Sequence, residues 1–288
     1  MKANGICSAS CGEFVQGFIG EDEYLCSYAI DKYSKVILEE KRENINKGPF
    51  KSRRALEKVF KKFDIPIKDS KNISLAISSD IPIGKGMASS TADIGATIGA
   101  TLSLIGETMT DEEVIKLATE IEPSDSVLLK NKSIINPING EIFKSMGSLK
   151  HARVIVLEPN QSISTRRFRK NPKYEELKYK NKEVIEEAFK LLEKGIVTND
   201  LSLVGQACTL SSMANENIHK KKHLDQIVKI ANTYGAYGVN IAHSGTVIGI
   251  LIDDTMNYKK ILSQIKTNRI NDFYRNIYVC NIIDGGVR

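Results

Sequence analysis

The sequence predicts an α+β protein of two domains, and three observations support this fold class. Segments with strand-like and helix-like patterns are mixed along the chain, without the regular alternation that a doubly wound parallel sheet requires. A length of 288 residues corresponds to about two domains at roughly 150 residues each. The strand-like segment HARVIVLEP, at 151–159, is followed mainly by helical patterns. We therefore expect domains at 1–150 and 151–288, with no flexible linker between them.

Four segments of the first domain have clear patterns. Residues 33–40 and 73–78 are rich in β-branched side chains and alternate as strands do. Residues 51–63 carry apolar side chains at helical spacing. Residues 88–105 indicate a helix of small residues. We expect this helix to end before Gly106, because glycine is typical of the position after a helix.

Capping residues predict where two more helices begin. Thr110 followed by Glu113 is a capping box, and it opens a helix that runs to about residue 120. An Asn-Pro pair opens a long helix over 171–194, because asparagine caps helices and proline fits their first turn. Gly195 is expected to end this helix.

The last third of the chain contains two further helices and several strands. The helices are expected over 199–218 and 222–234. The apolar run 237–252 indicates strands, which His-Ser-Gly interrupts at 243–245. A last strand is expected over 275–283, where the sequence is RNIYVCNII.

The composition excludes several classes of protein. Hydrophobic residues make up 41% and charged residues 26%, which is ordinary for a globular chain and excludes global disorder. No run of about 18 apolar residues is present, so we expect no membrane span. The first residues, MKANGICSASCGE, lack the apolar region of a secretory signal, so we expect no such leader.

The cysteine count indicates a reducing compartment. Five cysteines are present, which is an odd number, and no Cys-x-x-Cys pair occurs. We therefore expect reduced thiols and a cytoplasmic protein. The cysteines and the four histidines do not cluster at ligand spacings, so a zinc site is not expected.

Positive charge is concentrated in two segments of a chain whose net charge is +6. Residues 41–71 hold 11 lysines and arginines against 4 acidic residues, and a second basic cluster lies within 166–173. Such clusters form solvated faces, or they bind anionic substrates or nucleic acid. The two clusters lack the interleaved pattern of aromatic residues that single-strand binding requires, so nucleic acid is not expected as a partner. A basic RNA- or protein-binding module is the non-enzymatic alternative.

The stretch DIPIGKGMASSTA, at residues 80–92, carries the clearest chemical signal. A predicted strand leads into a loop of glycines and small residues, which continues directly into a helix. Glycines allow the backbone to approach a ligand closely, and the free amides of a helix N-terminus favour phosphate. The spacing fits neither a Walker A loop nor a G-x-G-x-x-G motif with its acidic partner. A phosphate site is one interpretation, and a polar cap on a buried helix is the other.

Three motifs resemble those of the GHMP kinases, a family that includes galactokinase, homoserine kinase and mevalonate kinase. They follow one another along the chain in the same order as in that family. The segment 82–92 is similar to the family's phosphate loop, P-x-x-x-G-L-G-S-S-A-A, with Met87 in place of leucine and Ala88 in place of glycine. Residues 8–13 (SASCGE) resemble the first motif, and 238–246 (GVNIAHSGT) occupy the place of the third. The resemblance covers nearly the whole chain.

The resemblance implies a fold, an activity and two ligands. The fold is the two-domain GHMP kinase fold, with a ribosomal S5 domain 2-like N-terminal domain, a ferredoxin-like C-terminal domain and ATP between them. The activity is phosphoryl transfer from ATP to a small hydroxyl compound, with Mg²⁺. Lys85 would either reach a phosphate oxygen or be a solvated loop residue. The implied ATP-binding residues are Pro82, Ile83, Gly84, Lys85, Gly86, Met87, Ala88, Ser89, Ser90, Thr91 and Ala92.

Carboxylates in and before the segment EPSDS are implied to have the catalytic and metal-binding roles. Asp125 lies where many family members have an aspartate that accepts the proton of the substrate hydroxyl. Its alternative role is a helix N-cap or an Asx turn. Ser90 and Glu122 are implied to bind Mg²⁺, which prefers oxygen ligands, with Glu120 as the alternative carboxylate.

The first and third motifs are implied to bind the acceptor substrate. Glu13 is a candidate for the amino group of an amino-acid substrate, and 244–246 for its carboxylate. The chain departs from the family at Ser10 or Cys11, where mevalonate kinase and galactokinase carry lysine or arginine, so strong activation of Asp125 is in doubt. The substrate-binding candidates are Ser10, Cys11, Gly12, Glu13, His243, Ser244, Gly245 and Thr246.

Within the family, one branch is more similar than the others. The strings SASCGEFVQG, GKGMASSTADI, EPSDS and AHSGTVIG resemble the L-threonine kinases that supply threonine phosphate for the cobalamin side chain. The implied substrate is L-threonine, and homoserine is the alternative because the two isomers differ only in the position of one hydroxyl. The oligomeric state is left open.

Overall fold

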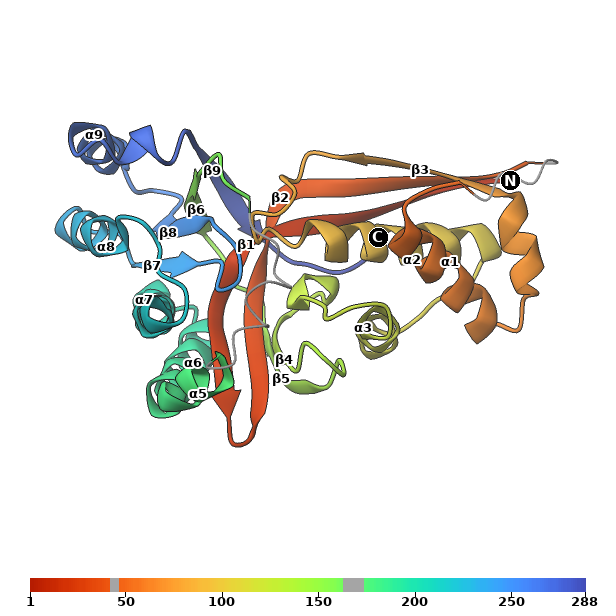
Figure 1. Ribbon diagram of the computed structural model, residues 1–288, viewed down its shortest axis with the longest axis horizontal. Helices are drawn as coiled ribbons and strands as arrows, with labels where there is room; N and C mark the ends of the chain where they lie inside the picture. Colours follow the sequence, from red (N-terminus) through yellow and green to blue (C-terminus); the bar gives the residue numbers. More distant parts are fainter. Residues whose placement is uncertain (42–46, 163–173) are drawn as a thin grey trace.

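The computed structural model describes residues 1–41, 47–162 and 174–288. Two long antiparallel strands, β1 (Lys2–Ile19) and β2 (Asp22–Glu40), form its spine (Figure 1). The register between them shifts several times between Ser8 and Val15, and the pair bends there, as β-bulges require. This bend lies where the N-terminal and C-terminal halves of the chain meet.

The described residues form a single sheet of nine strands, and its paired neighbours are antiparallel. The hydrogen-bonded order is β1-β7-β8-β6-β9-β2-β4-β5, with β3 paired to β2 and β1 paired to β2. The remaining strands are β3 (Ile73–Ser79), β4 (Lys132–Ile135), β5 (Ile142–Gly147), β6 (Ala152–Glu158), β7 (Gly238–Ile241), β8 (Ile248–Asp253) and β9 (Asn276–Ile283).

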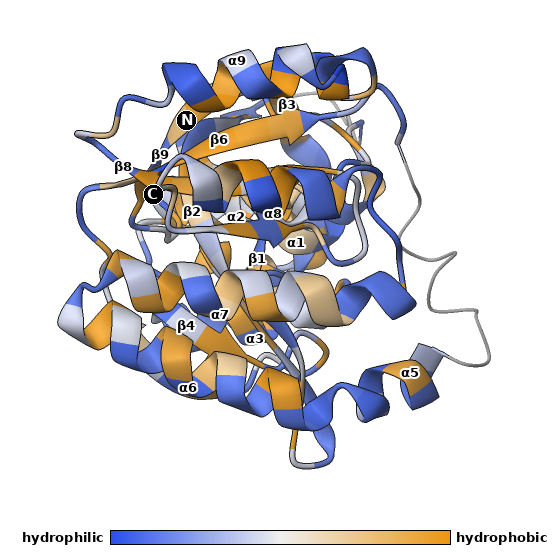
Figure 2. Ribbon diagram, turned by 90° about the vertical axis from the view of Figure 1, so that its left-hand side faces the viewer, coloured by the Kyte–Doolittle hydropathy of each residue, from blue (hydrophilic) through white to orange (hydrophobic). Residues whose placement is uncertain are grey.

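Helices cover the sheet in two groups. In the C-terminal half, α6, α7, α8 and α9 lie side by side in front of the sheet (Figure 2), and Ile227 and Ile261 are buried there with Ile155 of β6. In the N-terminal half, α1, α2 and α3 bury side chains such as Leu56 and Ile98. The described helices are α1 (Phe50–Lys62), α2 (Ser89–Ile105), α3 (Asp111–Thr119), α5 (Tyr174–Lys180), α6 (Lys182–Thr198), α7 (Leu201–Ala214), α8 (Leu224–Thr233) and α9 (Lys259–Thr267). Short 3₁₀ helices lie at Ile67–Asn72, Ser126–Leu128, Asn215–Asn217 and Ile270–Asp272.

The small residues of α2 let this helix pack directly on β1. A Cβ atom added at Gly5 would lie 2.1 Å from the carbonyl oxygen of Ala96 and 2.3 Å from the backbone nitrogen of Ala100. The predicted helix over 88–105 is therefore confirmed, and Gly106 follows it in the left-handed conformation, with φ of 75°. This close packing fixes the position of the α2 N-terminus, where the glycine-rich loop ends.

Most of the other predicted elements are also confirmed. Thr110 and Glu113 form the predicted capping box at the start of α3, with the nitrogen of Thr110 2.8 Å from Oε2 of Glu113. The apolar run 237–252 forms β7 and β8, separated by the loop at 242–247. The mixed α+β architecture is confirmed as well. The division of the chain near residue 150 stays a prediction.

The single long helix expected over 171–194 is wrong in two respects. The chain instead forms α5 and α6, and between them Nδ2 of Asn181 donates to the carbonyl of Ala214 at 2.5 Å. Gly195 does not end the helix, which continues to Thr198 and is followed by Asn199 in the left-handed conformation. Gly195 is instead a packing position, because a Cβ there would lie 2.8 Å from the backbone nitrogen of Val204. The Asn-Pro pair at 171–172 lies outside the described residues.

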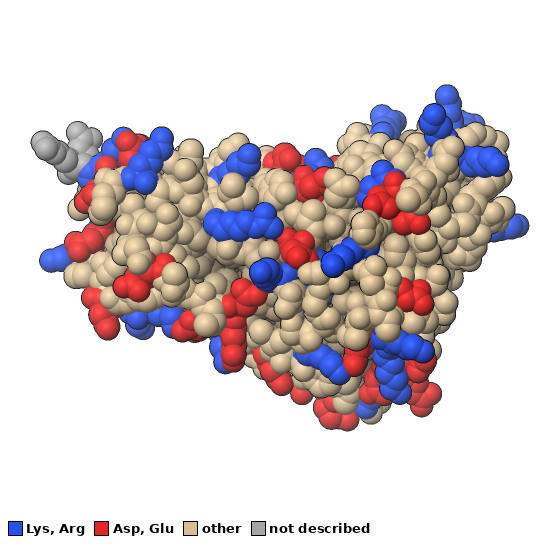
Figure 3. Space-filling model, turned by 180° about the vertical axis from the view of Figure 1, so that it is seen from behind, with Lys and Arg blue, Asp and Glu red and all other residues tan. Residues whose placement is uncertain are grey.

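The basic segment 41–71 is partly neutralised by acidic residues of α3 and the chain that follows it. Lys58 pairs with Glu120, and Nζ of Lys62 lies 2.9 Å from Oε1 of Glu113. Figure 3 shows lysines and arginines interspersed with acidic side chains over one face of the molecule. The second basic cluster, within 166–173, lies outside the described residues.

The five cysteines are free and buried, in agreement with the expected reduced thiols. Burial raises the pKa of the Cys11 thiol well above its usual range, so this residue is not a reactive nucleophile. None of the helices in the described part of the chain is both long and apolar enough to cross a membrane.

Candidate active site

A cavity of about 560 Å³ lies at the bend of β1 and β2, between the glycine-rich loop and the segment 122–125. Its walls come from β1, β2, α1, the start of α2 and the loop between β7 and β8. Its lining residues are Glu13, Gln16, Leu25, Lys51, Pro82, Ile83, Gly84, Gly86, Met87, Ala88, Ser89, Ser90, Thr91, Asp93, Glu122, Pro123, Ser124, Asp125, Pro137 and Ser244.

The glycine-rich loop is docked by its carbonyl groups. The N–H of Ser10 donates to the carbonyl of Met87 at 3.1 Å. The N–H of Gly12 donates to the carbonyl of Gly86, also at 3.1 Å. In a trans peptide the carbonyl and the next N–H point in opposite directions, so the amides that follow are turned away from β1. The loop therefore presents amide groups to the cavity, together with the N-terminus of α2, and this arrangement favours phosphate.

The loop between β7 and β8 holds the other side of the glycine-rich loop. The N–H groups of Thr246 and Val247 both donate to the carbonyl of Lys85, at 2.8 and 3.2 Å. At Gly86, with φ of 81°, a Cβ atom would lie 2.4 Å from Cβ of Ala242 and 2.8 Å from Cα of Gly245. The glycine-rich loop is thus held between the first motif (8–13) and the third motif (238–246) by hydrogen bonds from both.

Lys85 has neither of the two roles that the sequence suggested, a contact with phosphate or a solvated position in the loop. Its amino group donates to the carbonyls of Pro159 and Gln161, at 2.5 and 2.8 Å, and the residue is 7% exposed. The side chain ties the loop to the end of β6 and does not line the cavity. Ala92 is also buried outside the cavity lining, in the first turn of α2.

Of the substrate-binding candidates, only two line the cavity, Glu13 and Ser244. Ser10 and Cys11 are fully buried, and Gly12 is packed so closely on β7 that a Cβ would lie 2.4 Å from the carbonyl oxygen of Ile241. These three expectations of substrate contact are not met by the geometry. His243, Gly245 and Thr246 likewise lie behind the cavity wall.

His243 positions the carboxylate of Glu13. Its backbone N–H donates to Oε2 of Glu13 at 2.9 Å, and Nδ1 of its ring lies 3.0 Å from the same oxygen. On the other side of the ring, Nε2 lies 2.8 Å from Oγ of Ser211. Because a carboxylate only accepts, Nδ1 is assigned as the donor to Glu13, and the hydroxyl of Ser211, which accepts the N–H of Gln16 at 3.2 Å, is then assigned as the donor to Nε2. Glu13 is 7% exposed, so this network fixes its orientation.

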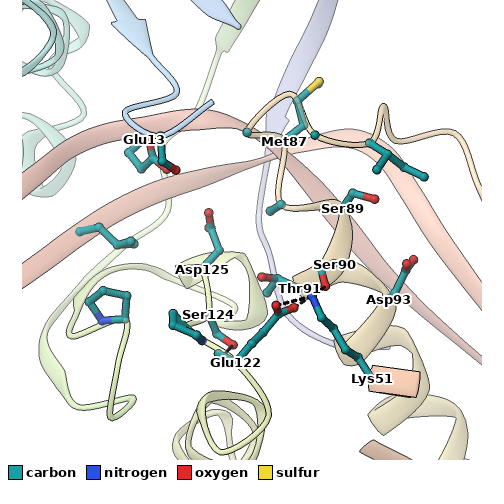
Figure 4. Close-up of a pocket in the computed structure, with 18 of the residues that line it drawn as sticks. Glu13, Lys51, Met87, Ser89, Ser90, Thr91, Asp93, Glu122, Ser124 and Asp125 are labelled. Carbon is teal, nitrogen blue, oxygen red and sulfur yellow. Dashed lines mark hydrogen bonds and ion pairs between the residues drawn. The ribbon is translucent and has the colours of Figure 1, made fainter. Parts of the chain in front are cut away.

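A second cluster joins Ser90, Glu122 and Lys51 (Figure 4). Ser90 Oγ donates to Oε1 of Glu122, and Nζ of Lys51 donates to Oε2 of Glu122 and to Ser90 Oγ, the latter at 2.8 Å. A hydroxyl and a carboxylate side by side are oxygen donors of the kind that Mg²⁺ takes. Glu120, the alternative carboxylate, pairs with Lys58 and does not line the cavity.

No group of three or more histidine, cysteine, aspartate and glutamate side chains in the described residues could hold a metal ion by itself. Two protein ligands suffice for Mg²⁺ in phosphoryl-transfer sites, because phosphate oxygens and water complete the coordination. The pair Ser90 and Glu122 therefore fits Mg²⁺ bound together with a nucleotide.

Asp125 lies in the cavity between these two clusters (Figure 4). Its carboxylate accepts hydrogen bonds from the hydroxyl of Ser27 and from the N–H of Val127. It also caps the 3₁₀ turn Ser126–Leu128, so the catalytic and the capping interpretations both describe its contacts. Burial and the negative charge of Glu13 raise the pKa of Asp125 to about 7, while the hydrogen bond from Ser27 lowers it. A carboxyl group with this pKa is suited to accept a proton near neutral pH.

Three residues that line the cavity, and one that contacts a lining residue, were not predicted from the sequence. Lys51 was part of the basic segment, but its spacing gave no sign that it reaches the glycine-rich loop. Gln16 and Asp93 were given no role, although they lie inside the strings SASCGEFVQG and GKGMASSTADI that carry the resemblance. Ser27 contacts Asp125 from β2, 98 residues away in the sequence, and only the folded chain brings the two together.

Comparisons with known proteins show which family the sequence matches. The model of the GHMP kinases N terminal domain matches residues 51–128, and that of the GHMP kinases C terminal domain matches 181–271. An L-threonine kinase from Salmonella typhimurium is 28% identical over 283 residues, which covers 98% of this chain and 94% of that protein. A homoserine kinase from Lactococcus lactis subsp. cremoris is 25% identical over 223 residues, covering 71% of this chain and 73% of that protein.

Solved structures show the same fold. The crystal structure of a homoserine kinase from Cytophaga hutchinsonii superimposes with a TM-score of 0.75 at 16% identity, and covers 100% of this chain and 96% of that one. A mevalonate kinase from Methanococcus jannaschii gives a TM-score of 0.69 at 21% identity, covering 99% of this chain and 98% of the other.

Proposed function

The chain belongs to the GHMP kinases, and we propose that it transfers a phosphate from ATP to the hydroxyl group of L-threonine, giving L-threonine O-3-phosphate. The observation that carries this proposal is the cavity, which has a phosphate-directed loop at one end and two carboxylates, Asp125 and Glu13, at the other. The full-length similarity to L-threonine kinases favours threonine over other acceptors. The product would serve the synthesis of the cobalamin side chain.

The nucleotide end of the site consists of the loop and the first turn of α2. The amides of Gly86, Met87 and Ala88 face the triphosphate, because the loop carbonyls are engaged on the opposite side. Ser90 and Glu122 would hold Mg²⁺, which would neutralise phosphate charge and help to orient the transferred phosphate. Phosphoryl transfer needs positioning and charge neutralisation more than covalent help, and these residues supply both.

Asp125 acts as the general base in this proposal. With a pKa of about 7, it is substantially deprotonated near neutral pH and can accept the hydroxyl proton as the substrate oxygen attacks the phosphate. Ser27 and the N–H of Val127 orient its carboxylate toward the cavity. The chain has no lysine or arginine in its first motif, so no cation from that motif activates Asp125.

Glu13 recognises the ammonium group of the amino acid in this proposal. Its Oε2 is held by His243, and the carboxylate lines the cavity. The backbone amides of Gly245 and Thr246 do not bind the substrate carboxylate, because they donate to Ala242 and Lys85 within the protein, at 3.2 and 2.8 Å. Ser244 is the residue of the third motif that lines the cavity and can donate to that carboxylate.

Product analysis tests this proposal directly. We expect that incubation with L-threonine, ATP and Mg²⁺ gives a phosphomonoester with the ³¹P NMR and mass-spectrometric signature of O-phospho-L-threonine. The double variant Ser90→Ala, Asp125→Ala is expected to lose turnover while it stays folded. If the product forms only with homoserine, the family assignment stands and threonine is the wrong substrate. If the double variant matches the native protein, the described site is not where the reaction occurs.

A further inference from the structure

The charges that line the cavity are unbalanced for binding a nucleotide. Among the described lining residues, Lys51 is the one lysine or arginine, against the carboxylates Glu13, Asp93, Glu122 and Asp125. A triphosphate carries about four negative charges, and its transfer requires cations placed at the oxygens where charge develops. The loop amides and one Mg²⁺ meet part of this need.

Lys51 is supplied by α1, outside the three motifs that resemble the family pattern. It is the second residue of this helix, and its side chain crosses to the start of α2. Its ammonium group donates to Ser90 Oγ at 2.8 Å and to the carboxylate of Glu122, and its side chain is 39% exposed. A long, partly exposed side chain of this kind can change partners without rearrangement of the backbone.

The two contacts of Lys51 are the same two groups that fit Mg²⁺. Ser90 Oγ and the Glu122 carboxylate cannot hold an ammonium group and a divalent cation in the same place, because the two positive charges repel at short range. When a nucleotide enters with its metal, the ammonium is displaced from Glu122. Glu122 is three residues from Asp125, so the displaced ammonium is near the end of the triphosphate that faces the acceptor hydroxyl.

We propose that Lys51 is a phosphate-binding residue, which moves from Ser90 and Glu122 to the γ-phosphate of the nucleotide when Mg²⁺ occupies these two ligands. This inference rests on the proposed kinase function and adds to it the cation that meets the transferred phosphate. Lysine suits the role because its ammonium is a compact point charge on a flexible stem. Lys51 thus keeps the metal ligands paired before the nucleotide binds and neutralises the γ-phosphate afterwards.

The test compares nucleotides with and without a γ-phosphate. Isothermal titration calorimetry measures the affinity of the native protein and of Lys51→Met for the non-hydrolysable analogue AMP-PNP and for ADP, both with Mg²⁺. We expect Lys51→Met to bind AMP-PNP about tenfold or more weakly than the native protein does, because a charged hydrogen bond is lost. Its affinity for ADP is expected to change little.

A matched control comes from the same helix. Lys58 pairs with Glu120 as Lys51 pairs with Glu122, but it does not line the cavity, so Lys58→Met is expected to bind both nucleotides like the native protein. An equal loss for AMP-PNP and ADP in Lys51→Met would mean that Lys51 acts only by holding the loop or the metal ligands, and would overturn the proposal. Unchanged affinity for AMP-PNP would also overturn it. If the native protein binds neither nucleotide, the kinase function itself fails.

Discussion

The backbone nitrogen of His243 lies 2.9 Å from Oε2 of Glu13 and joins two segments that are 230 residues apart. The same carboxylate oxygen lies 3.0 Å from Nδ1 of the His243 ring. These two contacts tie the bend of β1 to the loop between β7 and β8, which also holds the glycine-rich loop. The positions of the Glu13 carboxylate and of the glycine-rich loop are therefore both set by the loop between β7 and β8.

Glu13→Gln is expected to weaken binding of the amino-acid substrate without weakening binding of ATP. Because the charge that attracts the ammonium group is lost, KM for L-threonine should rise about tenfold or more. The control is 3-hydroxybutyrate, which lacks the amino group: any rate on this acceptor should be unchanged at pH 8, above the pKa of Asp125, which the charge of Glu13 raises to about 7. Steady-state kinetics with each substrate varied in turn gives the answer, and an equal loss with both acceptors would contradict the assigned contact.

The rate is expected to depend on the protonation of Asp125. Since burial and the charge of Glu13 raise its pKa to about 7, kcat/KM should increase as the pH rises through about 7 and then level off. Asp125→Asn removes the base and should lower kcat by about 10²-fold or more. A pH–rate profile from pH 5 to 9 measures both effects. A native profile that is flat across this range would exclude Asp125 as the base.

The same pKa shift predicts how stability depends on pH. The pKa of Asp125 in the folded protein is about 7, above its ordinary value of 3.8, so the native state binds more protons than the unfolded state between these values. This contribution to stability is full below the unfolded pKa and is lost as the pH rises through about 7. As the pH rises from 5 to 8, the free energy of unfolding of Asp125→Asn should therefore increase by about 1–3 kcal/mol relative to that of the native protein. Urea unfolding of both proteins at the two pH values measures this change. If the difference in unfolding free energy between them is the same at pH 5 and pH 8, the prediction is wrong.

Two substitutions in the glycine-rich loop are expected to change the stability of the fold in opposite directions. Gly86→Ala places a Cβ 2.4 Å from Cβ of Ala242 at a φ of 81°, and should destabilise the fold by about 2 kcal/mol or more. Ala88 has a φ of 57°, which is costly for an L-residue, so Ala88→Gly should stabilise the fold by about 0.5–1 kcal/mol. Thermal or urea unfolding of the two variants tests the pair. Destabilisation by Ala88→Gly would show that the alanine side chain contributes packing that outweighs its backbone strain.

Local patterns predicted the helices of the N-terminal half well, because short segments such as 51–63 and 110–113 contain their apolar faces and capping residues. The strand β1 was not predicted, and the reason is physical. From Cys7 onward it is buried on both faces, and it is rich in serine, cysteine and glycine, so neither alternation nor β-propensity marks it. Gly195 was misread as a helix end because a glycine that permits close packing looks the same in a sequence as one that ends a helix.

The residues of the candidate site also divide into those that local sequence patterns predict and those that only the folded chain reveals. The phosphate loop, Glu13, Glu122 and Asp125 were found because they belong to contiguous motifs, and each of these motifs lines the cavity. Ser27 and Lys51 were not found, since they reach the site from β2 and α1 only through tertiary packing. The orientation of Lys85 was also beyond sequence reasoning, because its carbonyl partners lie at the end of β6.

The proposed substrate is best tested by the rate of ADP release with ATP and Mg²⁺, measured for L-threonine, L-serine, L-homoserine and mevalonate at equal concentrations below KM. We expect kcat/KM for L-threonine to exceed that for each of the others by about tenfold or more, a difference of about 1.4 kcal/mol in transition-state binding. A preference for L-homoserine would contradict the proposed substrate within the family. No turnover with any of the four would contradict the proposal that this cavity phosphorylates a small hydroxy amino acid.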